Sequence, residues 1–259
     1  MSLKNKIVLI TGASSGIGAA CARQFAMQAV RLILCARRLE KLHELADELR
    51  AKHKADVLTM QLDVTEMDQV AEVLRALPDD WRTVDILVNN AGLAAGLDTI
   101  QEGNIDDWEA MIDTNVKGLL YVTKSILPQM ITRNAGHIIN IGSIAGHTVY
   151  PKGAVYCASK HAVKALSDGL RMDLFGMKIR VSTIDPGAVE SNFSLVRFKG
   201  DNARAASVYA GMEALTPDDV ADAVLYCATR PPHVNISEVI IMPVDQASAT
   251  MVSRKDRHQ

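Results

Sequence analysis

The chain lacks an excess of one charge, paired cysteines and a long apolar run. Its 28 Lys and Arg residues nearly balance its 30 Asp and Glu residues, so no nucleic-acid partner is expected. The first apolar run, Ile7 to Ile10, is far shorter than the ~20 residues of a membrane span, so we expect a cytoplasmic protein without membrane contact. The cysteines have no CxxC or metal-ligand spacing, which favours free thiols over disulfides and predicts no metal site. They are Cys21, Cys35, Cys157 and Cys227.

What the chain does have is an alternation of short β-branched runs with amphipathic segments. Hydrophobic residues make up 48% of its 259 residues, which is enough for a sizeable core. The short runs are apolar at nearly every position, as in a parallel sheet covered on both faces. We therefore predict an α/β fold: one Rossmann-like, doubly wound parallel sheet of about seven strands, with helices on both faces, formed by residues 1–259 as a single domain. The predicted strands are 6–10, 31–36, 56–62, 85–90, 136–141, 179–184 and 237–242.

A helical period of apolar residues predicts helices between several of these strands. Two other segments show no such period. Residues 186–207 form a long irregular stretch, which predicts a substrate lid or disorder. Residues 243–259 are polar, which indicates an interface arm or a frayed tail. The predicted helices include 39–52, 106–131, 153–175 and 216–229, the last opened by a Thr cap and a Pro.

A glycine-rich loop, ITGASSGIGAA, follows the first predicted strand, and its glycines are spaced G-x-x-x-G-x-G. Glycines let the backbone turn tightly and approach a pyrophosphate, which lies on the amides of the following helix N-terminus. The strand before this loop and the helix after it distinguish the loop from an ordinary turn. The sequence therefore predicts a dinucleotide site at Gly12, Ser14, Ser15, Gly16, Ile17 and Gly18.

The end of the second predicted strand indicates which dinucleotide binds. Sites of this kind often carry an acid there for the ribose 2′-hydroxyl, but here the chain has Arg37 and Arg38. Guanidinium groups suit a 2′-phosphate through charge and fork geometry, so NADP(H) is favoured over NAD(H). The alternative is two solvated arginines at a helix start.

Further motifs follow in the same strand–helix order, and together they resemble the short-chain dehydrogenase/reductase family over essentially the whole chain. The resemblance implies that an Asn, a Ser, a Tyr and a Lys act together in catalysis. The matching residues are Asp63 and Val64, NNAG at 89–92, Asn115, Ser143, YCASK at 156–160, and Pro186 with Gly187, so the implied tetrad is Asn115, Ser143, Tyr156 and Lys160.

The chemistry of carbonyl reduction agrees with this tetrad. The cofactor supplies a hydride, and the protein supplies orientation and acid–base groups. A free tyrosine has a pKa of about 10, and we expect Lys160, one helical turn from Tyr156, to lower it. Ser143 is expected to bond the substrate oxygen and, by the resemblance, Asn115 to hold a water near Lys160. The resemblance also implies cofactor contacts from Asp63, Val64, Asn90, Ala91, Gly92, Tyr156, Lys160, Pro186, Gly187 and Val189.

A closer resemblance narrows the substrate. DILVNNAGLAAG, VRFKGD and PPHVNISEVIIMPVDQ are similar to segments of NADP-dependent 3-hydroxy acid dehydrogenases, also described as serine or allo-threonine dehydrogenases. The resemblance to this group implies oxidation of small 3-hydroxy acids such as 3-hydroxypropionate and reduction of the matching 3-oxo acids. It also implies a homotetramer formed through the long helices around Asn115 and Tyr156. A broad carbonyl or steroid reductase of the same family and a non-catalytic NADP-binding regulator are the alternatives.

A carboxylate substrate requires a cation in the site. The hypothesised substrate contacts are Arg197 and Lys199 in the irregular stretch, together with Ser143 and Tyr156. Lys152 is a further candidate cation. The alternative is a solvated charge or a structural ion pair.

The helix of the YCASK motif carries a second reactive pair, Cys157 and His161, which also lie one turn apart. No orienting acid or oxyanion donor can be assigned to this pair. Because it faces about 100° away from Tyr156 and Lys160, we expect it to serve packing or a subunit interface.

Overall fold

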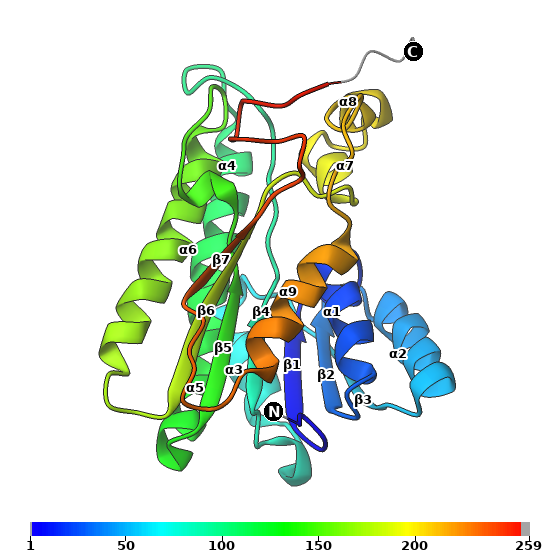
Figure 1. The fold of residues 1–259 in the computed structure, drawn as a ribbon, viewed down its shortest axis with the longest axis vertical. Helices are drawn as coiled ribbons and strands as arrows, with labels where there is room; N and C mark the ends of the chain where they lie inside the picture. The colour runs from blue at the N-terminus through cyan, green and yellow to red at the C-terminus, as the bar shows by residue number, and fades with distance from the viewer. Residues whose placement is uncertain (1, 255–259) are drawn as a thin grey trace.

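The seven predicted strands form one parallel sheet in the order β3-β2-β1-β4-β5-β6-β7 (Figure 1). The computed structural model describes residues 2–254. Each observed strand begins and ends within two residues of its prediction, so the α/β, doubly wound prediction is confirmed. The strands are β1 (Ile7–Thr11), β2 (Arg31–Ala36), β3 (Asp56–Gln61), β4 (Ile86–Asn89), β5 (Gly136–Ile141), β6 (Ile179–Pro186) and β7 (Glu238–Ile241).

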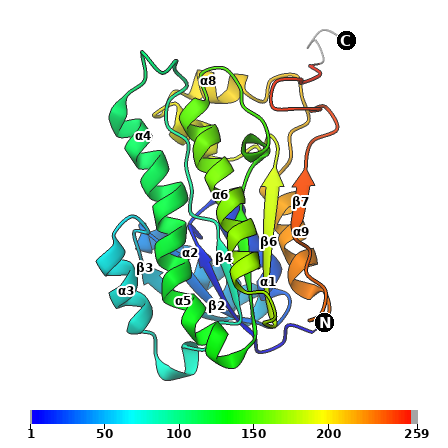
Figure 2. The same ribbon diagram turned by 90° about the vertical axis from the view of Figure 1, so that its left-hand side faces the viewer.

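Helices cover both faces of this sheet (Figures 1 and 2). One face carries α1 (Gly16–Ala26), α2 (Leu39–His53) and α9 (Pro217–Thr229). The other carries α3 (Met67–Arg75), α5 (Leu119–Arg133) and α6 (Ala154–Asp173), with α4 (Ile105–Ile112) packed against α6. Two short helices, α7 (Phe193–Arg197) and α8 (Asn202–Ser207), lie beyond the ends at which β6 and β7 finish.

The core consists of two apolar layers separated by the sheet. Successive residues of β1 face opposite layers: Val8 and Ile10 pack with α1 and α9, whereas Ile7 and Leu9 pack with α3 and α5. This alternation explains why the strands are apolar at nearly every position, since neither face is exposed to water. In the part of the chain that is described, no helix is both long and apolar enough to cross a membrane.

The segment predicted as one helix from 106 to 131 is interrupted. Between α4 and α5 the backbone forms a π-helical turn, η2 (Asp113–Gly118). Gly118 ends this turn against Val64, and a Cβ at Gly118 would lie 2.7 Å from Val64 Cγ2. Single π-turns inside helices often occur at functional sites. This one contains Asn115, so the interruption lies where the family resemblance places a catalytic residue.

The stretch 186–207 is not irregular throughout, because α7 and α8 form within it, so that part of the prediction was wrong. Asp201 caps α8 by accepting a hydrogen bond from the Arg204 backbone N–H. Helices of five and six residues are too short to show a hydrophobic period. Short 3-10 turns, η1 (Asp79–Trp81) and η3 (Ile144–Gly146), complete the elements.

The described part of the predicted C-terminal arm folds back over the loop after β6. Gln246 Oε1 accepts a hydrogen bond from the Ala188 backbone N–H at 2.8 Å. Arg254 donates to the carbonyls of Val208, at 3.1 Å, and Ala210. Residues 243–254 therefore border the same region as α7 and α8, while the rest of the predicted arm, 255–259, lies outside the described residues.

Candidate active site

A cavity of about 500 Å³ opens where the strands finish, between the glycine loop and α7. Parallel strands bring their carboxyl ends to one edge, so loops that are distant in sequence meet there. The predicted sites meet around this cavity, which is lined among others by Gly12, Asn90, Ser143, Tyr156, Lys160 and Arg197.

Tyr156 and Ser143 are both buried at the edge of this cavity. Tyr156 lies near the start of α6, and Ser143 follows β5. The Ser143 backbone N–H donates to Asp185 Oδ1 at 3.0 Å, and its hydroxyl oxygen accepts from the Ala145 N–H at 3.1 Å. Burial raises the pKa of Tyr156 well above its ordinary value, and a hydrogen bond with Ser143 lowers it in part. The phenol is therefore protonated at neutral pH.

Lys160 lies one turn along α6 from Tyr156 and is also buried. Its Nζ donates to the Ile141 carbonyl at 2.9 Å. Burial lowers the pKa of Lys160 to about 8, against the opposing influence of Asp185. Ser143 and Arg197 lower the pKa of Tyr156 by less than burial raises it, and a lowering by Lys160 stays a prediction.

Asn115 reaches the same site from the π-turn. Its Oδ1 accepts from the Leu93 N–H and its Nδ2 donates to the Leu93 carbonyl, both at 2.8 Å. A Cβ on Gly92 would lie 3.2 Å from Asn115 Oδ1 and 3.6 Å from Lys160 Nζ, so these two side chains flank one glycine. The structure thus brings together the four residues of the implied tetrad.

The glycine loop has the backbone that its spacing predicts. Gly12 and Gly16 have φ values of +64° and +53°, which favour glycine. A Cβ on Gly12 would lie 2.9 Å from Ala91 Cα, whereas a Cβ on Gly16 would meet only Ser191 Cβ, at 3.8 Å, so the loop is open on the cavity side. Ser15 caps no amide of α1, whose first turn has no acid. The amide groups are available to an anion, which fits the pyrophosphate of a dinucleotide.

The two arginines after β2 lie beside this loop. Arg38 Nη2 donates to the hydroxyls of Ser14 and Ser15 at 3.1 and 3.2 Å. The Arg37 side chain is 70% exposed and 4.0 Å from Asp63, which makes it a weak ion pair. Two guanidinium groups at the mouth of a phosphate loop fit a dinucleotide with a 2′-phosphate.

The other predicted cofactor contacts divide into two sets. Asn90 Nδ2 bonds the Thr11 and Gly12 carbonyls at 2.9 and 3.1 Å and so holds the glycine loop. Asp63 and Val64 are not part of the cavity lining, since Asp63 accepts from Thr65 and Val64 packs on Gly118. The predicted contacts that line the cavity besides Gly12, Gly16 and Asn90 are Ser15, Ile17, Ala91, Gly92, Tyr156, Lys160, Pro186, Gly187 and Val189, whereas Ser14, Gly18, Arg37 and Arg38 are not part of its lining.

The structure distinguishes the three candidate cations for a substrate carboxylate by their positions relative to the cavity. Arg197, at the end of α7, lines the cavity with its guanidinium carbon 5.1 Å from the centre of the Tyr156 ring. Its Nη2 donates to the Tyr150 hydroxyl at 2.6 Å, while its buried Nε has no hydrogen-bond partner among residues 2–254. Lys199 instead pairs with Asp107 at 2.9 Å, and Lys152 lines a smaller adjoining pocket. Among these three, only Arg197 lines the cavity together with Ser143, Tyr156 and Lys160, while Lys152 shares its smaller pocket with Tyr156 and Arg197.

Sequence reasoning missed the aromatic side chains around Arg197. Tyr150 binds its guanidinium, and Phe193 packs edge-on against Tyr156 with ring centroids 5.7 Å apart. Both lie outside long periodic segments. The one feature of the sequence that could have indicated them is composition, because aromatic residues make up only 4% of the chain and a local cluster of them is unusual.

Cys157 packs in the core, as expected, whereas His161 is exposed, so a role for His161 in packing or a subunit interface stays a prediction. Cys157 is fully buried, and burial raises the pKa of its thiol. His161 Nδ1 contacts the Cys157 carbonyl at 2.9 Å rather than the sulfur. All four cysteines are free thiols, as predicted.

Comparison with known proteins agrees with this geometry. A family model described as short chain dehydrogenase matches residues 6–201. The chain belongs to this family. It is 49% identical over 244 residues to the NADP-dependent 3-hydroxy acid dehydrogenase YdfG of Salmonella typhi, covering 94% of this chain and 97% of that protein. It is 46% identical over 250 residues to sulfoacetaldehyde reductase 2 of Chromohalobacter salexigens, covering 96% and 98%.

Among solved structures, the closed form of serine dehydrogenase complexed with NADP+ superposes with a TM-score of 0.90. Its sequence is 47% identical, and the match covers 96% of this chain and 100% of that one. The resemblance inferred from the motifs is therefore confirmed at the level of the family.

Proposed function

We propose that the protein is an NADP(H)-dependent oxidoreductase that transfers a hydride between the cofactor and a small 3-hydroxy acid or the matching 3-oxo acid. Serine, allo-threonine and 3-hydroxypropionate represent the substrate class. The observation that carries the proposal is Arg197, a half-buried residue whose guanidinium lies over the ring of Tyr156 and whose buried Nε has no hydrogen-bond partner among the described residues. In a 3-oxo acid one carbon separates the carboxylate from the carbonyl, so both groups can be held at neighbouring side chains.

The chain's residues have distinct roles in this proposal. NADP(H) supplies or accepts the hydride when bound. In reduction, Tyr156 gives its proton to the substrate oxygen while the Ser143 hydroxyl bonds that oxygen; in oxidation, the proton returns to Tyr156. Lys160 acts on the Tyr156 hydroxyl and exchanges protons with it, and Asn115 positions the groups through which those protons pass. Burial favours the protonated phenol, which is the form needed for reduction.

Arg197 binds the carboxylate and thereby fixes which carbon faces the cofactor. A charged fork gives two parallel hydrogen bonds to an anion, and burial strengthens them. The relatives named for 3-hydroxy acids and for serine support this substrate class.

The test compares Arg197→Ala with Lys199→Ala, a matched control that removes a nearby cation outside the cavity. Arg197→Ala should lower kcat/KM for 3-hydroxy acids by roughly 10- to 100-fold, the worth of a charged hydrogen bond. Turnover of a neutral alcohol should change much less, and Lys199→Ala should leave both near wild type. Equal behaviour of the two variants toward the acids would reject the role of Arg197. Thermal unfolding curves of both variants separate a binding loss from misfolding.

A second candidate substrate is a sulfonate such as sulfoacetaldehyde. The 46%-identical relative that is named for this aldehyde supports it. Its sulfonate stands one carbon from the carbonyl, as the carboxylate does in malonic semialdehyde, and a guanidinium binds either anion. Cofactor-absorbance assays with both aldehydes, and with apolar ketones, decide among the acid, the sulfonate and a broad carbonyl or steroid reductase. Absence of any turnover would favour the non-catalytic NADP-binding alternative.

We also propose a cytoplasmic homotetramer. Four buried free thiols suit a reducing compartment. At the end of α6, Met172 and Phe175 are 75% and 92% exposed, and near β7 the side chain of Val244 is fully exposed. Exposed apolar side chains of this size favour a protein interface. Analytical ultracentrifugation tests the state, and a monomer at micromolar concentration would contradict it.

A further inference from the structure

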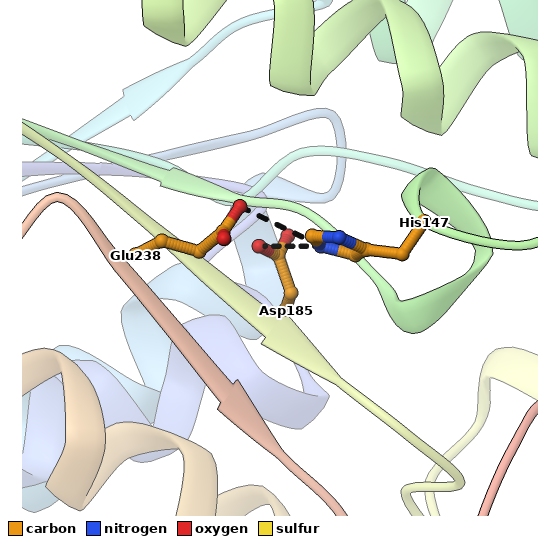
Figure 3. A group of neighbouring side chains, drawn as sticks. All are labelled: His147, Asp185 and Glu238. Atoms are coloured by element: carbon orange, nitrogen blue, oxygen red, sulfur yellow. Dashed lines mark hydrogen bonds and ion pairs between the residues drawn. The ribbon is translucent and has the colours of Figure 1, made fainter.

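Three ionisable side chains outside the cavity lining meet one another (Figure 3), and one of them, Asp185, accepts a hydrogen bond from the Ser143 backbone N–H. Asp185 comes from the end of β6, Glu238 from the start of β7, and His147 from the loop after η3. His147 Nε2 lies 3.2 Å from Asp185 Oδ2 and 3.6 Å from Glu238 Oε1. The imidazole therefore bridges two carboxylates on neighbouring strands.

Asp185 extends the hydrogen-bond ladder between β5 and β6 by one step. The Gly142 N–H donates to the Ile184 carbonyl at 2.8 Å, and the next donor, the Ser143 N–H, finds Asp185 Oδ1 at 3.0 Å. The carboxylate lies where a side chain at position 142 would be, because a Cβ on Gly142 would collide with Asp185 Oδ1. Ser143 is thus attached by its backbone to a buried side chain.

The carboxylate of Asp185 is only 2% exposed as a residue and needs compensation. Burial raises its pKa, and the bonds from His147 and from the Ser143 N–H lower it. On the outer side, Glu238 Oε1 pairs with Lys164 Nζ at 2.8 Å, and Lys164 also lies 3.6 Å from Asp168. The ionisable groups facing Asp185 are therefore His147, Glu238 and, from α6, Lys160.

A metal ion does not suit this cluster, although its donor types would allow one. Asp185 Oδ1 is bonded by Ser143, Asp185 Oδ2 by His147, and Glu238 Oε1 by the Lys164 ammonium. A cation bound through these same oxygens would compete with Lys164 and with the attachment of Ser143. The contacts present are those of a completed hydrogen-bond network.

We propose that Asp185 and His147 are a positioning pair for Ser143: Asp185 fixes the serine backbone, and His147, held by Glu238, fixes Asp185. The inference rests on the proposed role of Ser143 in binding the substrate oxygen. The geometry that matters is local, because a shift of about 1 Å in a group that orients the substrate can cost about 100-fold in rate.

The kinetic test uses Asp185→Ala, Asp185→Asn and His147→Ala, with Asp168→Asn as a matched control on the far side of Lys164. Asp185→Ala should lower kcat by about 100-fold with little change in KM for NADP(H). Asp185→Asn keeps an oxygen for the Ser143 N–H and should recover most of that loss. His147→Ala should fall between them, and Asp168→Asn should match wild type.

The pH profile separates positioning from a merely structural role. The Asp185 anion raises the pKa of Lys160, so its removal in Asp185→Asn should move the alkaline fall of activity to lower pH. An unchanged kcat and profile in Asp185→Asn and His147→Ala would overturn the proposal. So would losses that simply follow the melting temperature. If Asp185→Ala fails to fold, the other two variants decide.

A crystal structure of Asp185→Asn or His147→Ala tests the pair independently of any substrate. Displacement of the Ser143 hydroxyl in His147→Ala supports it, and an unmoved Ser143 rejects it even if the enzyme acts on 3-hydroxy acids. Conversely, a wild-type enzyme inactive on these acids, with Ser143 displaced in the variant, rejects the proposed substrate class and leaves the positioning pair standing.

Discussion

The two halves of the cavity differ in the groups that form them: one is mainly backbone and the other is side chains. The half after β1 and β2 consists mainly of backbone: left-handed glycines, the amides at the start of α1, and carbonyls held by Asn90. The half after β5 and β6 consists of side chains from distant segments, among them Ser143, Tyr156 and Arg197. A backbone site binds what all dinucleotides share, whereas a side-chain site can change its substrate one residue at a time.

Tyr156→Phe should show the largest effect on activity, and it should impair only the function of the side-chain half. Removing the group that transfers the proton should cost about 100- to 10,000-fold in kcat. The affinity for NADP(H), followed by cofactor fluorescence, should stay near wild type because the glycine loop is untouched. Cys157→Ser, one residue away on the packing edge, is the control and should keep most activity. Retained turnover in Tyr156→Phe would contradict the proposed acid–base role.

Arg37→Asp combined with Arg38→Leu should break only the cofactor half. Loss of charged hydrogen bonds to the 2′-phosphate should lower the kcat/KM ratio of NADP(H) over NAD(H) by roughly 10- to 100-fold. Substrate preference, measured at saturating cofactor, should not change. Unaltered cofactor selectivity would mean that the two arginines are solvated charges, the alternative that their exposure allows.

The effect expected to be smallest near neutral pH is the pH dependence of Lys160, which lies where the two halves of the cavity meet. Lys160, whose pKa burial lowers to about 8, loses its proton as the pH rises through that value. If the ammonium is needed, kcat/KM for the cofactor, which reports the free enzyme, should fall about tenfold per pH unit above that value. A profile flat to pH 10 would show that the charge on Lys160 is not required.

The stability linked to Lys160 has the opposite sign. Its folded-state pKa lies below the ordinary value of 10.5, so the unfolded chain binds more protons between about pH 8 and 10.5. The contribution of this group to folding stability should therefore increase over that window while activity decreases. Denaturant midpoints measured across the same range, with Lys160→Met as reference, would detect the difference.

The sequence alone predicted the backbone half better than the side-chain half for a physical reason. A glycine spacing between a strand and a helix is local, and Gly12 and Gly16 have the φ values that the spacing requires. The tetrad was predictable only through the family motifs, because Asn115 and Ser143 reach Tyr156 from other elements. The π-turn that carries Asn115 leaves no mark in the hydrophobic period.

Arg197 and Lys199 show where sequence reasoning ends. They are two residues apart and both were plausible carboxylate ligands, but Asp107 pairs with Lys199 and Tyr150 holds Arg197. Those partners lie 92 and 47 positions away in the chain, so no local pattern distinguishes the two cations. The bridge of His147 between Asp185 and Glu238 was missed for the same reason.

The overlap between Gly142 and Asp185 also limits how this protein can evolve. Since the carboxylate occupies the space that any side chain at position 142 would need, a first substitution at Gly142 is blocked while Asp185 is present. Replacing Asp185 by a smaller residue first would open the space but release Ser143. Position 142 should therefore remain glycine wherever Asp185 is present, and lineages with another residue at 142 should also carry a smaller residue at 185.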